Sequence, residues 1–124
     1  MKRLLPVILA LTLVTVGCQP IEMSARDSIA GAKGFLDEAA KKHPECASNP
    51  SGVMACNLIN RGNAAKHTAG AALKVYCSGD QFDAGTGPCQ PPTDKNARDQ
   101  AAAKLKSATQ ELQIIVDSLK KAIG

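Results

Sequence analysis

Five cysteines constrain this chain of 124 residues more than any other feature. They stand at positions 18, 46, 56, 77 and 89, and an odd number leaves one cysteine outside any set of intramolecular disulfides. The other four permit three pairings, and counting cysteines does not choose among them. The choice depends on the secondary structure that separates them.

Hydrophobic periodicity predicts three helices, over residues 25–42, 52–77 and 93–123. The third has the clearest pattern, because apolar residues recur at alternating steps of four and three through Leu105, Leu112 and Leu119. The segments 45–51 and 78–92 read as loops, since they are rich in residues that form turns. We therefore expect an all-α, up-down-up three-helix bundle. Gly62 and Gly70 mark the places where the second helix could break.

This arrangement selects the disulfide pairing. Cys56 and Cys77 lie at opposite ends of the second predicted helix, about 31 Å apart, whereas a disulfide needs Cα atoms within about 7 Å. Cys46 precedes the start of that helix, so a pairing with Cys77 would span the same gap. The local pairs Cys46–Cys56 and Cys77–Cys89 remain. Their spacings are unlike the close cysteine pairs of structural zinc sites, so we expect no metal.

The N-terminus is typical of a secretory signal peptide. Lys2 and Arg3 precede an apolar run over residues 4–16. A helix of that length measures about 20 Å, and the hydrocarbon core of a bilayer measures about 30 Å. The run is therefore too short to span a membrane comfortably.

The end of this run, Thr15-Val16-Gly17-Cys18, resembles the lipobox of bacterial lipoproteins, although Thr15 stands where Leu is usual. The resemblance implies cleavage of a signal peptide over 1–17, a covalent diacylglycerol on Cys18, a lipidated tether over 18–23 and a helical domain over 24–124. Gln19, in place of Asp, implies sorting to the periplasmic face of the outer membrane if the organism is Gram-negative. The resemblance covers these first residues only, and the remaining chain is assigned to no known family.

Composition and motifs argue against several function classes. The formal charge of +4 includes Lys2 and Arg3, which a signal peptidase would remove, and aromatic residues make up only 2% of the chain. Nucleic-acid binding is therefore not expected. The sequence has no Walker loop, dinucleotide fingerprint, zinc-protease motif or nucleophile elbow, and its two histidines, His43 and His67, have no free nucleophile to pair with. We expect no enzyme and no cofactor other than the lipid.

Candidate partner contacts lie in the second loop and the third helix. Phe82 is a lone apolar residue in a polar loop, and it would either pack on the end of the bundle or meet a partner. Ile115 and Leu119 belong to the apolar stripe of the third helix, which would form core or a contact with another chain.

A second resemblance concerns residues 43–57. His43-Pro44-Glu45, with Cys46 and Cys56 ten residues apart, looks similar to a cysteine-pair segment of the plasmid exclusion lipoproteins that block redundant conjugation.

The sequence as a whole favours a lipid-anchored interaction or structural domain of the cell envelope that contacts another envelope protein. A carrier for a small apolar ligand and an envelope exclusion or immunity factor are the alternatives.

Overall fold

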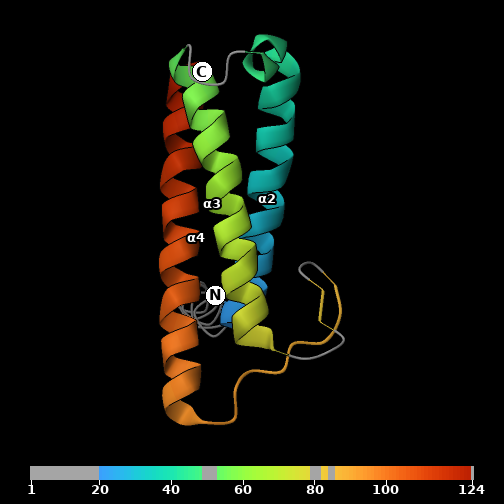
Figure 1. Cartoon of the computed structure of the whole chain (residues 1–124), viewed down its shortest axis with the longest axis vertical. Helices are drawn as coiled ribbons and strands as arrows, with labels where there is room; N and C mark the ends of the chain where they lie inside the picture. Colours follow the sequence, from blue (N-terminus) through green and yellow to red (C-terminus); the bar gives the residue numbers. More distant parts are fainter. Residues whose placement is uncertain (1–19, 49–52, 79–81, 84–85, 124) are drawn as a thin grey trace, which may run out of the picture.

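A computed structural model describes residues 20–48, 53–78, 82–83 and 86–123 of the chain. Three long helices lie side by side: α2 (Ile21–Lys42), α3 (Met54–Cys77) and α4 (Lys95–Ile123). A short 3-10 helix, η1 (Pro44–Ala47), follows α2. Figure 1 shows that α2 and α4 run in one direction and α3 in the other, which confirms the up-down-up bundle. Each helix packs on both others.

The interior consists of three layers of small and medium-sized side chains. One layer surrounds Leu73, Tyr76 and Leu105, near the N-terminal end of α2. The middle layer, around Leu112 and Val116, is completed by alanines of all three helices. The third layer surrounds Leu36 and Leu58 with further residues at the other end of the bundle. The described residues bury no charged side chain, so apolar packing dominates the stability of the interior.

Helix α3 is continuous through both glycines that could have broken it. Gly62 is buried, and a Cβ built on it would lie 2.6 Å from Leu36 Cδ2. Its missing side chain therefore makes room for a large residue of α2, and the two helices approach closely here. A Cβ on Gly70 would meet no atom within 4 Å.

The helix starts differ from the predicted ones. Helix α2 begins at Ile21, within the segment predicted as tether, because Ile21 packs against the layer around Tyr76 and Leu73. The backbone N–H groups of Met23 and Ser24 donate to the carbonyl of Pro20, so the first turn of the helix starts at Pro20.

The starts of the other two helices also move. Helix α4 begins at Lys95, two residues later than predicted, because Asp94 is its cap: the Ala97 backbone N–H donates to Asp94 Oδ2 at 2.9 Å. Helix α3 begins at Met54 after an extended Val53, two residues later than predicted.

The glycine positions of α3 give a stability prediction. Gly62→Ala should destabilise the fold by about 1 kcal/mol, because the clash with Leu36, only 1% exposed, outweighs the better helix propensity of alanine. Gly70→Ala on the same helix is the matched control, and it should stabilise the fold by up to about 1 kcal/mol. Urea unfolding of both variants measures the difference. Equal shifts of the two midpoints would contradict the close approach.

Candidate functional site

The two disulfides are Cys46–Cys56 and Cys77–Cys89, as the helix geometry predicted, with Cα–Cα distances of 5.0 and 4.4 Å. The first joins η1 to the start of α3, and the second joins the end of α3 to the segment before α4. They therefore lie at opposite ends of the bundle (Figure 1). Each end is a candidate functional surface, because the bridges fix its loops.

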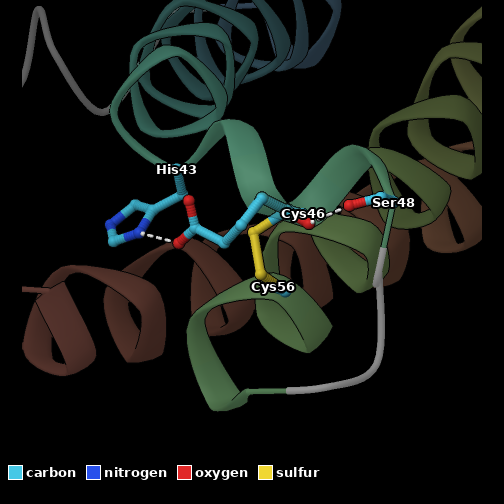
Figure 2. The surroundings of a disulfide bond; sticks show 5 residues. His43, Cys46, Ser48 and Cys56 are labelled. Carbon is cyan, nitrogen blue, oxygen red and sulfur yellow. Dashed lines mark hydrogen bonds and ion pairs between the residues drawn. A yellow bond between two sulfur atoms is a disulfide. The ribbon is translucent and has the colours of Figure 1, made fainter.

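The end with Cys46–Cys56 is a compact turn, shown in Figure 2. His43 Nδ1 lies 3.1 Å from Glu45 Oε1, and the Ser48 hydroxyl donates to the Glu45 carbonyl at 3.2 Å. A hydrogen bond from the backbone of Glu45 itself, and then one from the His43 ring, lowers the pKa of the Glu45 carboxyl below its ordinary value. The turn therefore presents a carboxylate at neutral pH.

A pocket of about 230 Å³ opens beside this disulfide. It is smaller than most drug-sized ligand sites and would accommodate one side chain of a partner more readily than a cofactor. His43 is the one titratable residue among those that line it, and two asparagines supply amide groups. The lining residues are Ala40, His43, Pro44, Cys46, Ala47, Cys56, Ile59, Asn60 and Asn63.

The same turn contains one group of potential metal ligands, formed by Glu45, Cys46 and Cys56. The two sulfur atoms are bonded to each other, so neither is a thiolate that could bind a metal ion. A single exposed carboxylate remains, and this group is not a metal site.

At the opposite end, Arg26 of α2 holds the loop that follows α3. Its Nη2 donates to the Gly87 carbonyl at 2.8 Å, and its guanidinium lies 5.0 Å from the centre of the Phe82 ring. Arg26 Nε lies 3.0 Å from Glu22 Oε2, at ion-pair distance but without hydrogen-bond alignment. Three different contacts therefore converge on one half-buried cation.

Further hydrogen bonds join the described residues of this loop. Asp83 and Thr86 exchange two backbone hydrogen bonds in an isolated bridge, and the Gln90 N–H donates to the Cys77 carbonyl. The Ser78 hydroxyl donates to the Gln90 carbonyl. Gly87 has a φ of 85°, a conformation that glycine adopts without strain.

The candidate partner contacts at Phe82, Ile115 and Leu119 are corrected by the structure. Their exposed fractions are 7%, 5% and 0%, so the three side chains lie in the core. Phe82 joins the layer around Tyr76, which confirms the alternative that it packs on the end of the bundle. Ile115 and Leu119 face the interior because the apolar stripe of α4 is shared with α2 and α3.

Arg26 was not among the site residues predicted from the sequence. Cys18, the predicted lipid attachment site, lies outside the described residues. The i, i+4 spacing of Glu22 and Arg26 was a visible signal for their ion pair. The contact between Arg26 and Phe82 joins residues far apart in sequence, so no local sequence pattern predicts it.

No family model, no curated protein and no solved structure matches this chain. Among the helices of the described residues, none combines the length and the hydrophobicity that crossing a membrane requires.

The Arg26 contacts give a local-stability prediction. Arg26→Ala should raise the hydrogen-exchange rates of the Asp83 and Thr86 amides about tenfold, because it removes the hydrogen bond to Gly87 and the contact with Phe82. Lys33→Ala, which removes only an exposed ion pair with Asp37, is the control and should leave these rates unchanged. Unchanged rates in Arg26→Ala would show that the loop is held by its backbone and disulfide alone.

The His43–Glu45 contact gives a pH prediction. The folded pKa of Glu45 lies below the unfolded one, so the interaction stabilises the fold above the ordinary pKa of glutamate and is lost as the pH falls through the folded pKa. His43→Ala should raise the Glu45 pKa only part of the way to its ordinary value, because the backbone hydrogen bond is the larger cause. NMR titration of the Glu45 side chain measures its pKa in the wild-type protein and in His43→Ala. A full return to the ordinary value would mean that His43 alone causes the shift.

Proposed function

We propose that this protein is a lipid-anchored cell-envelope lipoprotein whose helical domain acts without catalysis as an interaction or structural module. The observation that carries the proposal is the distribution of the cysteines. Four of the five form the two local disulfides, and the fifth, Cys18, stands at the end of the lipobox-like segment. Disulfides persist in oxidising compartments such as the periplasm, where such lipoproteins reside.

The start of α2 supports attachment close to the membrane. Ile21 is already helical and packed on the bundle, only three residues after Cys18. An acylated Cys18 would therefore hold the end of the bundle that carries Arg26 and the Cys77–Cys89 bridge near the bilayer. The end with the Cys46–Cys56 turn and its pocket would face away, where an envelope partner could reach it. Two or more acyl chains give durable attachment without a membrane-spanning helix.

A carrier function has less support. The pocket near Cys46 and a shallow hollow over Ser78 and 89–94 both lie at ends of the bundle. Between the ends, Leu36 fills the space over Gly62, and alanines fill the middle layer. An interaction surface on the outside of the bundle fits this packing better than an internal ligand site.

Metabolic labelling tests the attachment. Cells that express the full chain should incorporate labelled palmitate into the protein, and Cys18→Ser should abolish the label and move the protein from the membrane fraction to the soluble fraction. The double variant Cys46→Ser, Cys56→Ser is the control, and its folded fraction should keep the label because those sulfurs pair with each other. Label that persists in Cys18→Ser would refute lipidation at this residue.

A further inference from the structure

The outer face of α4 carries a stripe without charge. Six exposed residues recur on it at steps of four and three, on the side of the helix opposite the core positions Leu105 and Leu112. Four of the five charged residues between Asn96 and Ile114 lie beside the stripe, and Arg98, seven residues before Leu105, lies on the opposite side of the helix. Ile114, 65% exposed, is its largest apolar member. We call this the outer stripe: Asn96, Gln100, Ala103, Ser107, Gln110 and Ile114.

Charges of opposite sign flank the outer stripe in a regular order. Asp99 and Lys106 stand on one side, and Lys104 and Glu111 stand on the other. In a parallel, in-register pair of helices, a residue on one flank meets the residue five positions later on the other flank of its partner helix. Asp99 would then meet Lys104 of a second copy, and Lys106 would meet Glu111. Both pairs are attractive, so the surface is complementary to itself.

Within the described part of one chain, three of these four charged residues form no ion pair. Lys104, Lys106 and Glu111 are exposed and form no ion pair with any residue in the described part of the chain. Asp99 is bound by Lys95 at 2.8 Å, one turn earlier on α4. Of the two intermolecular pairs, Lys106–Glu111 is therefore the one in which neither residue has an ion-pair partner within the described part of its own chain.

We infer that the outer stripe of α4 binds a second copy of this chain in parallel orientation. The inference rests on the proposed function, because two copies anchored in one leaflet at the same end would present α4 in the same direction. The contact is weak, since Gln100, Ser107 and Gln110 contribute little apolar area at the centre of the stripe. Confinement to one leaflet raises the effective concentration and compensates for this weakness.

Charge reversal in the full, membrane-anchored chain tests the inference. A photocrosslinking amino acid at position 103, in the outer stripe, should yield a covalent homodimer in intact cells. The same probe at position 64, exposed on α3, is the control and should yield little. Lys106→Glu or Glu111→Lys should each lower the dimer yield about fivefold, because attraction becomes repulsion in both symmetric pairs. The double variant Lys106→Glu, Glu111→Lys should restore the yield, because the pairs are attractive again.

Each outcome has a separate meaning. If the dimer yield of the double variant stays as low as that of the single variants, the parallel register is wrong. If the probe crosslinks to a different protein, the partner of the outer stripe is not a second copy of this chain. Protein that is found in the membrane fraction, labelled with palmitate but not crosslinked, overturns this inference and leaves the anchoring intact. Unlabelled protein in the soluble fraction overturns the proposed function, and the inference falls with it.

Discussion

Two local disulfides hold the ends of this three-helix bundle together. Each closes a short loop at one end of a bundle whose interior is built mainly from alanine and medium-sized aliphatic residues. Such an interior buries little area per residue, and a domain of this size is marginal on burial alone. The chain-entropy model gives each bridge on the order of 3 kcal/mol. The bridges therefore offset the thin core, and they tie stability to an oxidising environment.

Small residues explain how three helices pack without a large core. Gly62 lets Leu36 lie directly on the backbone of α3, and alanines at the middle layer bring the helix axes together. Because most core residues are small, few large side chains are available to cover the ends of the bundle. Phe82 and the Arg26 contacts cover one end, and the Cys46–Cys56 turn covers the other.

The sequence predicted the elements of the fold well, because the period of the apolar residues is a direct consequence of which helix faces are buried. The local disulfide pairing was predictable because α3 holds Cys56 and Cys77 too far apart to bond to each other. Helix starts were less predictable: burial of Ile21 extended α2 into the predicted tether, and the cap at Asp94 placed the start of α4 two residues after the predicted one. The burial of Phe82 left two outcomes open, because its contact with Arg26 depends on how a loop folds back onto a distant helix. The lipid anchor stays a prediction from the first eighteen residues.

The chemistry of the five cysteine sulfurs links this fold to the proposed function. Peptide mapping by mass spectrometry of the protein extracted from cell membranes, without reducing agent, tests that link most directly. The account predicts two bridged peptide pairs, Cys46 with Cys56 and Cys77 with Cys89, and an N-terminal peptide that begins at Cys18 and carries the mass of a diacylglycerol. An uncleaved N-terminus with five free thiols would contradict it.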